Sequence, residues 1–217
     1  KLMDLFNYSR RESTEVNVGA TPLGGANPIR IQSMTNTVTL DTEACVEQAK
    51  RIIDAGGEYV RMTTQGVREA ENMMNINIGL RSQGYDAPLV ADVHFNPNVA
   101  DVAARYVEKV RINPGNYRTS DRRLERLIEK CRTRGVALRI GVNHGSLAKR
   151  VFDEWGDPPE GMVVSAMEFL RVCRAEGFDQ VVVSMKSSNT RVMVYAYRLL
   201  VAAMREEGMV YPIHLGV

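Results

Sequence analysis

Apolar and polar positions along the chain form two alternating kinds of segment. Short, nearly continuous apolar runs, typical of strands buried on both faces, are separated by longer segments with the helical period of about 3.6 residues. The apolar runs predict seven strands, at 28–34, 58–63, 88–93, 107–113, 136–142, 180–185 and 210–215. The longer segments predict helices at 41–55, 67–83, 98–106, 120–134, 161–176 and 190–207, most of them ending at a glycine.

Strand–helix repetition with short turns predicts a parallel sheet covered by helices. Doubly wound sheets and (β/α)8 barrels both have this pattern. We favour the α/β TIM-type barrel because no glycine-rich dinucleotide loop follows the first strand. With about seven strands present, we expect the N-terminal part of a barrel, with the last unit missing. The domain would span 1–217 and be truncated at its C-terminal end. Segment 14–27 is predicted to form a hairpin that covers the barrel bottom.

The composition fits one domain with a substantial core, since 44% of the 217 residues are hydrophobic. Lys plus Arg is 28 and Asp plus Glu is 26, so no overall basic field favours nucleic acid as a partner. Neither a membrane-spanning apolar run nor a secretory signal is present, and we expect a cytoplasmic protein without a membrane partner. Cys45, Cys131 and Cys173 are too far apart for a metal-binding spacing, and we expect buried thiols.

Cationic and neutral polar side chains recur at the C-terminal ends of predicted strands, where such barrels have their active sites. They are Arg61, Arg111, Asn113, Arg139, Asn143, His144, Ser146, Ser184 and Lys186. Four cations at one mouth would repel each other unless they share an anion. A diphosphate matches their charge, and guanidinium groups bind it in a bidentate manner. Any single arginine could equally be paired with a neighbouring carboxylate, so the inference depends on the recurrence.

The third predicted strand ends differently, with Asp92 and His94 two positions apart and hence on one face of the strand. This spacing predicts a catalytic pair that handles a proton or orients the substrate. A role of Asp92 in helix capping or arginine pairing stays open. A metal site is the weaker interpretation, because His214 is the only other such ligand at a strand end. We place His214 among the substrate-binding residues, with no metal site in this chain.

The motifs PIRIQSMTNT, ADVHFN, KVRINPGN, RIGVNHGSL, SMKSSN and HLGV, in this order, resemble the 4-hydroxy-3-methylbut-2-enyl diphosphate synthase family. These are iron–sulfur enzymes of non-mevalonate isoprenoid biosynthesis. The resemblance covers 10–217, and the stretches GDPPEGMVVSA and NTRVMVYAYRLL resemble the long form found in plants and some bacteria. That form has an insert domain between its barrel and its cluster domain, so we expect the insert and iron–sulfur domains to be absent here.

The resemblance implies an oxidoreductase that opens 2-C-methyl-D-erythritol 2,4-cyclodiphosphate. Two electrons arrive from flavodoxin or ferredoxin through a 4Fe-4S cluster, and a hydroxyl leaves as water. By position, Arg61, Arg111, Arg139 and Lys186 would bind the diphosphate. By the same resemblance, Asn113 and Asn143 would be substrate-binding residues. Asp92 and His94 would match the pair of polar residues that the family has at the barrel mouth. The family's cluster ligands have no counterpart among the three cysteines, so we expect no cofactor in this chain and no turnover by it alone.

Two alternatives stay open. A transferase barrel similar to dihydropteroate synthase would also have an anion pocket but would need no iron. A barrel kept only as a diphosphate-binding module would lack a downstream cysteine trio, which the synthase requires. The edges of an unclosed sheet can pair with a second chain, so a homodimer is a further expectation. The stretch 117–123 looks shorter than in the long form.

Overall fold

The computed structural model describes residues 6–7, 9–118, 120–145, 147–155 and 159–216. One parallel sheet contains the strands in chain order, and helices alternate with them. The strands are β1 (Gln32–Met34), β2 (Tyr59–Thr64), β3 (Leu89–Val93), β4 (Lys109–Ile112), β5 (Ala137–Asn143), β6 (Val181–Lys186) and β7 (Ile213–His214). The helices are α1 (Thr42–Asp54), α2 (Val67–Ser82), α3 (Pro97–Ala103), α4 (Arg123–Arg134), α5 (Lys149–Trp155), α6 (Glu160–Ala175) and α7 (Thr190–Glu206), with a 3-10 turn η1 at Pro114–Asn116.

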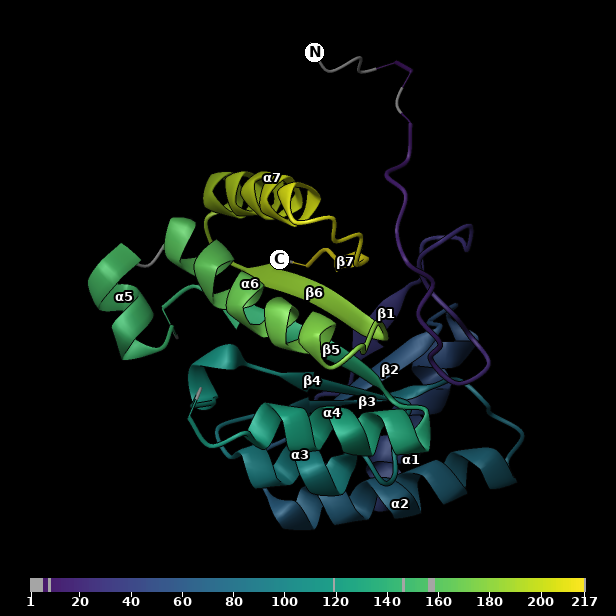
Figure 1. Cartoon of the computed structure of the whole chain (residues 1–217). Helices are drawn as coiled ribbons and strands as arrows, with labels where there is room; N and C mark the ends of the chain where they lie inside the picture. The colour runs from purple at the N-terminus through teal and green to yellow at the C-terminus, as the bar shows by residue number, and fades with distance from the viewer. Residues whose placement is uncertain (1–5, 8, 119, 146, 156–158, 217) are drawn as a thin grey trace.

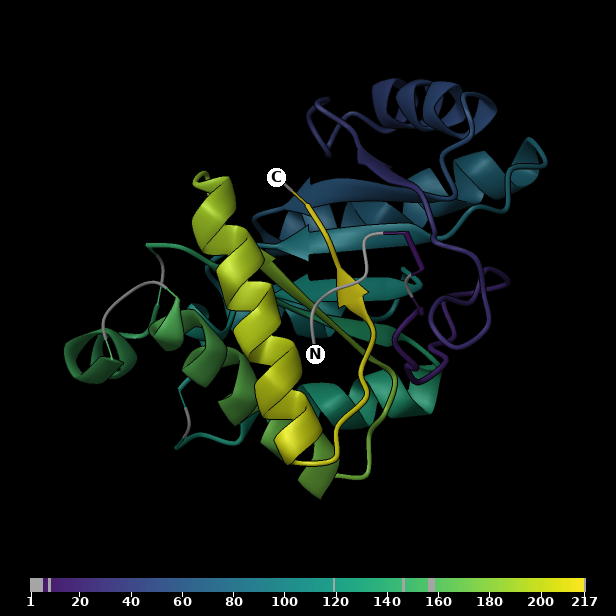
Figure 2. The same ribbon diagram turned by 90° about the horizontal axis from the view of Figure 1, so that it is seen from above.

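The sheet curls so that its helices lie on the outside, as Figure 1 and the view from above in Figure 2 show. Every strand pairs in parallel with the next one along the chain, and within the described residues β7 does not pair with β1. The prediction of an α/β TIM-type barrel with about seven strands is therefore confirmed.

Several predicted boundaries were too long, and one helix was missed. The first strand begins at Gln32, because the preceding Ile31 joins β2 only through its carbonyl. The seventh strand shrinks to Ile213–His214, with one neighbouring strand to pair with. Trp155, which the Gly- and Pro-rich sequence places in a loop, is instead the last residue of α5.

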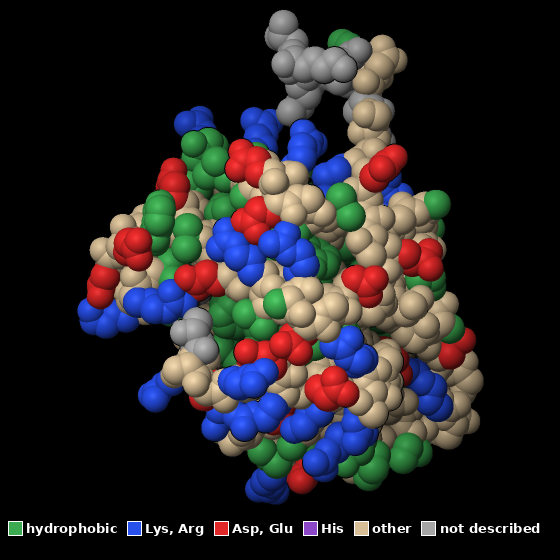
Figure 3. Space-filling model, viewed as in Figure 1, with side chains coloured by type: hydrophobic (Ala, Val, Ile, Leu, Met, Phe, Trp, Pro, Cys, Tyr) green, Lys and Arg blue, Asp and Glu red, His purple; other side chains and the backbone are tan. Residues whose placement is uncertain are grey.

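Helix ends are set by the residues that the sequence offers there. The Asp41 side chain accepts a hydrogen bond from the backbone N–H of Ala44 at 3.0 Å and starts α1. Helix α4 ends at Gly135, whose φ of 67° is left-handed and favours glycine. The outer helices present mixed Lys, Arg, Asp and Glu side chains to solvent (Figure 3). No helix in the described part of the chain has the length and apolarity needed to cross a membrane.

The core has two parts. The larger part fills the layer between the sheet and the helices and includes the three cysteines, which are buried and free as predicted. The smaller part lies inside the curl and contains Val16, Val18, Tyr59, Val90, Ala137 and Val182. Segment 14–27 therefore covers the bottom of the barrel, although its hairpin pairing is limited to one antiparallel bridge, Val16 to Leu23. Above this apolar floor the interior becomes polar.

Candidate functional site

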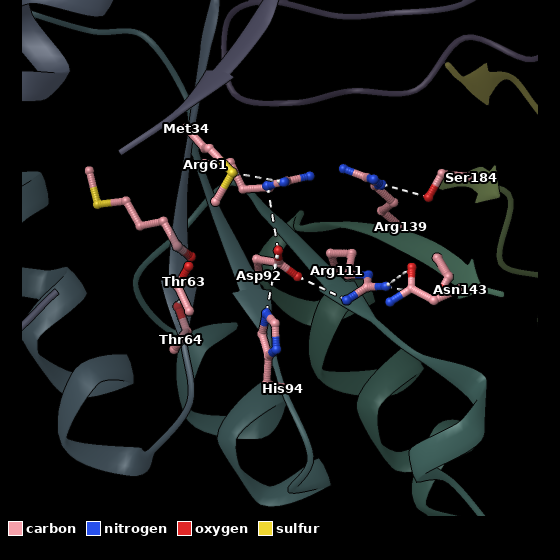
Figure 4. Close-up of polar contacts among 12 residues, drawn as sticks. Met34, Arg61, Thr63, Thr64, Asp92, His94, Arg111, Arg139, Asn143 and Ser184 are labelled. Carbon is pink, nitrogen blue, oxygen red and sulfur yellow. Dashed lines mark hydrogen bonds and ion pairs between the residues drawn. The ribbon is translucent and has the colours of Figure 1, made fainter. Parts of the chain in front are cut away.

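The polar interior follows from strand alternation. Side chains two positions apart in a strand share a face, so Arg111 points inward together with Lys109. The register pairs Asp92 of β3 with Arg111 of β4, and Arg111 with Arg139 of β5. These charged side chains therefore gather inside the barrel near the C-terminal strand ends (Figure 4).

Asp92 is the centre of this cluster. Its carboxylate lies 3.1 Å from Arg111 Nη1, 3.5 Å from Arg61 Nε and 3.5 Å from His94 Nε2. Burial raises the pKa of the Asp92 carboxyl, but the close contact with His94 and the charges of Arg111 and Arg61 outweigh burial and leave it at about 2. Asp92 and His94 lie close together, and Asp92 also pairs with two arginines, which is the alternative that the sequence left open. A catalytic role of Asp92 and His94 stays a prediction.

Arg111 is held by β5 as well as by Asp92. Its Nη2 donates to the Gly141 carbonyl at 3.1 Å and to Asn143 Oδ1 at 3.1 Å. A Cβ at Gly141 would lie 2.4 Å from Arg111 Nε, so only glycine leaves space for this guanidinium. Asn143 thus contacts Arg111 directly. Substrate binding by Asn143 stays a prediction.

Arg139 is buried without a carboxylate partner. Its Nε donates to Ser184 Oγ at 2.8 Å, and its Nη1 has no hydrogen-bond partner among the described residues. Burial, followed by the charges of Arg61 and Arg111, lowers the pKa of the Arg139 guanidinium to about 9. Within the same part of the chain, Lys186 also forms no ion pair. The interior therefore has fewer negative than positive groups, a condition that favours an anion.

A cavity of about 270 Å³ lies above these groups. It is lined by Gln32, Ser33, Met34, Arg61, Arg139, Ser184, Met185, Lys186, His214, Leu215 and Gly216. Five predicted site residues from four strands thus share one hollow: Arg61, Arg139, Ser184, Lys186 and His214. Burial, with the charges of Arg139, Lys109 and Arg61, lowers the pKa of the His214 imidazole to about 2, so this ring is neutral.

Asn113 and His144, two other predicted residues, are not among those that line this hollow. The Asn113 side chain accepts a hydrogen bond from Gly115 N–H at 2.9 Å and caps the turn η1. His144 Nδ1 lies 3.2 Å from Ser187 Oγ. Ser146 is outside the described residues. Substrate binding by Asn113 stays a prediction.

Lys109 is an interior cation that sequence reasoning missed. Its side chain is fully buried, and its Nζ lies 4.5 Å from the ring centroid of Tyr59. The sequence does indicate an inward-facing Lys109, because this residue precedes Arg111 by two positions in the run KVRIN and so shares its strand face.

The residues that the structure describes do not fit an iron–sulfur cluster. Cys45, Cys131 and Cys173 are buried in α1, α4 and α6. Across the described ranges, no three His, Cys, Asp or Glu side chains are grouped so that they could hold a metal ion. Burial raises the pKa of the Cys131 and Cys173 thiols to about 12, which disfavours the thiolate that a metal requires.

Comparison with solved structures supports the fold. A 3-dehydroquinate dehydratase from Geobacillus kaustophilus superposes with a TM-score of 0.63 at 13% identity, over 92% of this chain and 77% of that chain. A dihydropteroate synthase from Xanthomonas albilineans superposes with a TM-score of 0.61 at 15% identity, over 93% of this chain and 76% of that one. Identities this low show a shared fold only.

Comparison with curated sequences is more specific. A 4-hydroxy-3-methylbut-2-en-1-yl diphosphate synthase (flavodoxin) from Phocaeicola vulgatus is 69% identical over 99% of this chain. A protein of the same name from Porphyromonas gingivalis is 51% identical over the whole chain. The chain spans only 38% and 40% of the lengths of these two relatives. Residues 13–217 match the family profile described as the GcpE TIM-barrel domain. The chain therefore belongs to the GcpE family, and residues 13–217 match that family's TIM-barrel domain.

Proposed function

We propose that this chain is the substrate-binding barrel of a synthase that reductively opens 2-C-methyl-D-erythritol 2,4-cyclodiphosphate to 4-hydroxy-3-methylbut-2-enyl diphosphate. The observation that carries the proposal is the charge imbalance inside the barrel. Arg61 and Arg111 share the single carboxylate of Asp92, and Arg139 has none among the described residues. A diphosphate supplies the missing negative charge and enough acceptor oxygens for several guanidinium groups.

The cavity and its neighbours suggest a division of roles. Arg61, Arg139 and Lys186 line the hollow and bind the diphosphate, with Ser184 holding Arg139 in place. Asp92 positions Arg111, and it fixes His94 at the mouth as a proton donor for the departing hydroxyl. In the free chain Asp92 takes the place of a ligand anion for Arg111. A bound diphosphate would share these arginines with Asp92.

The electrons must come from elsewhere. We propose a 4Fe-4S cluster in a part of the whole enzyme outside this chain, reduced by flavodoxin or ferredoxin. The names of the relatives specify flavodoxin for those proteins. We expect this chain to bind the cyclic diphosphate without turning it over. Homodimer formation through the open sheet edges stays a prediction.

Calorimetric titration with the cyclic diphosphate tests the binding role. Arg139→Ala should weaken binding by at least about 2 kcal/mol, because charge-assisted hydrogen bonds are lost. Arg171→Ala is the matched control, since Arg171 pairs with Glu207 on the outer surface and should leave affinity unchanged. Equal affinities for both variants would reject the cation cluster. Binding of a pterin in place of the diphosphate would favour the transferase alternative.

A further inference from the structure

Lys109 is a buried amine that the proposed binding role leaves unexplained. Its side chain has no exposed surface, and its Nζ has no hydrogen-bond acceptor among the described residues. Its Nζ lies over the face of the Tyr59 ring, 4.5 Å from the ring centroid. A cation–π contact compensates only part of the loss of water around an ammonium group.

The groups around Lys109 disfavour its charge further. Arg61 on β2 and Arg139 on β5 are positive, and the His214 ring on β7 is neutral. The carboxylate of Asp92 on β3 already pairs with Arg61 and Arg111. Burial, followed by the charges of Arg139 and Arg61, lowers the pKa of the Lys109 amine to about 7. At mildly alkaline pH the amine of the free protein is therefore mostly neutral.

An anion above the cluster would reverse this balance. Arg61 and Arg139 line the mouth cavity, so negative charge bound there offsets the two positive charges that act on Lys109. The interior is poorly solvated, so such charges act over several ångströms. We propose that Lys109 is a further group of the ligand site, an amine that is neutral in the ligand-free protein and takes up a proton when a diphosphate binds. This inference rests on the proposed diphosphate-binding function.

The cyclic diphosphate is a suitable probe. Each of its phosphorus atoms carries one strongly acidic oxygen, so the ligand itself does not titrate near neutral pH. Binding enthalpies measured at about pH 8 in HEPES and in Tris then report protons taken up by the protein. We expect uptake approaching one proton per ligand at this pH, and little uptake at about pH 6, where Lys109 is already charged.

Lys109→Met is the decisive variant, because methionine keeps the length of the side chain and removes the buried amine. It should bind the ligand with heats that do not depend on the buffer. Its affinity should also vary less with pH, whereas the wild-type dissociation constant rises by up to about ten-fold per pH unit above pH 8. Lys130→Met is the control, since Lys130 pairs with Asp101 at the surface, and it should keep the wild-type proton uptake.

These measurements distinguish a failure of the proposed Lys109 role from a failure of the proposed diphosphate-binding function. Tight binding of the wild type without buffer-dependent heat, or uptake retained in Lys109→Met, would overturn the role of Lys109 alone. Absence of any binding would reject the proposed function instead. A second measurement needs no ligand: in lysine-labelled protein, the Lys109 side-chain carbon resonances should titrate near neutral pH. A Lys109 that stays protonated to about pH 10, as ordinary lysines do, would overturn the inference.

Discussion

Asp92 and Arg111 form a buried ion pair at 3.1 Å between neighbouring strands, and each side chain is less than a tenth exposed. The register places the two residues directly opposite each other on β3 and β4. Because Arg61 reaches the same carboxylate, one acid organises two of the cations at the mouth. Replacing Asp92 should therefore destabilise the fold, because the arginines lose their internal partner. The same change should strengthen the binding of an external anion, because the arginines become available to it.

Asp92→Asn should lower the free energy of unfolding at neutral pH by about 2 kcal/mol. The folded-state pKa of Asp92, about 2, lies below its ordinary value of 3.8. Its contribution is therefore complete above about pH 4 and is lost as pH falls toward 2. Urea unfolding at a series of pH values checks this. The difference between wild type and Asp92→Asn should shrink on acidification, and a difference that stays constant from pH 6 to about pH 3 would contradict the assignment.

Gly141→Ala should weaken diphosphate binding by about ten-fold or more, because the added Cβ would lie 2.4 Å from Arg111 Nε and displace the guanidinium. Gly66→Ala is the control, since a Cβ there meets no atom within 4 Å. Calorimetry with the cyclic diphosphate measures both variants. Wild-type affinity in Gly141→Ala would show that Arg111 can move without consequence.

Much of this architecture follows from the sequence. Near-continuous apolar runs such as 180–185 predicted buried parallel strands, and the lack of a glycine-rich dinucleotide loop after the first strand favoured the barrel. The predicted cations Arg61, Arg111 and Arg139 do gather at one end, because parallel strands align their C-terminal ends.

The sequence does not determine which polar groups pair with one another inside the barrel. The sequence leaves open whether Asp92 or an external anion meets Arg111, since that depends on the register between β3 and β4. Likewise, Asn113 could contact a ligand or cap its own turn, and its local hydrogen bond to Gly115 became visible only in three dimensions. Helix α5 was missed because the Gly and Pro residues after Trp155 favoured a loop over the whole stretch.

Ser184→Ala should weaken diphosphate binding several-fold by removing the hydroxyl that receives Arg139 Nε at 2.8 Å. Ser165→Ala, a similarly buried serine in α6, controls for the general effect of losing a hydroxyl group from the core. Both variants should show comparable changes in melting temperature. A loss of affinity in both, or in neither, would mean that Ser184 does not position Arg139.

Tyr197→Phe should destabilise the end of the sheet. The buried hydroxyl receives the Met185 N–H at 2.8 Å, lies 2.9 Å from the Met185 carbonyl and also contacts the His214 carbonyl, so it ties β6 to β7. Its loss leaves a buried N–H unpaired, at a cost of about 1–3 kcal/mol in the free energy of unfolding. Hydrogen exchange should accelerate at β7 before the rest of the sheet. Tyr195→Phe, on the exposed face of the same helix, should change neither quantity. If the two variants unfold at the same denaturant concentration, the hydroxyl bridge does not stabilise β7, and the position of His214 at the mouth must depend on backbone pairing alone.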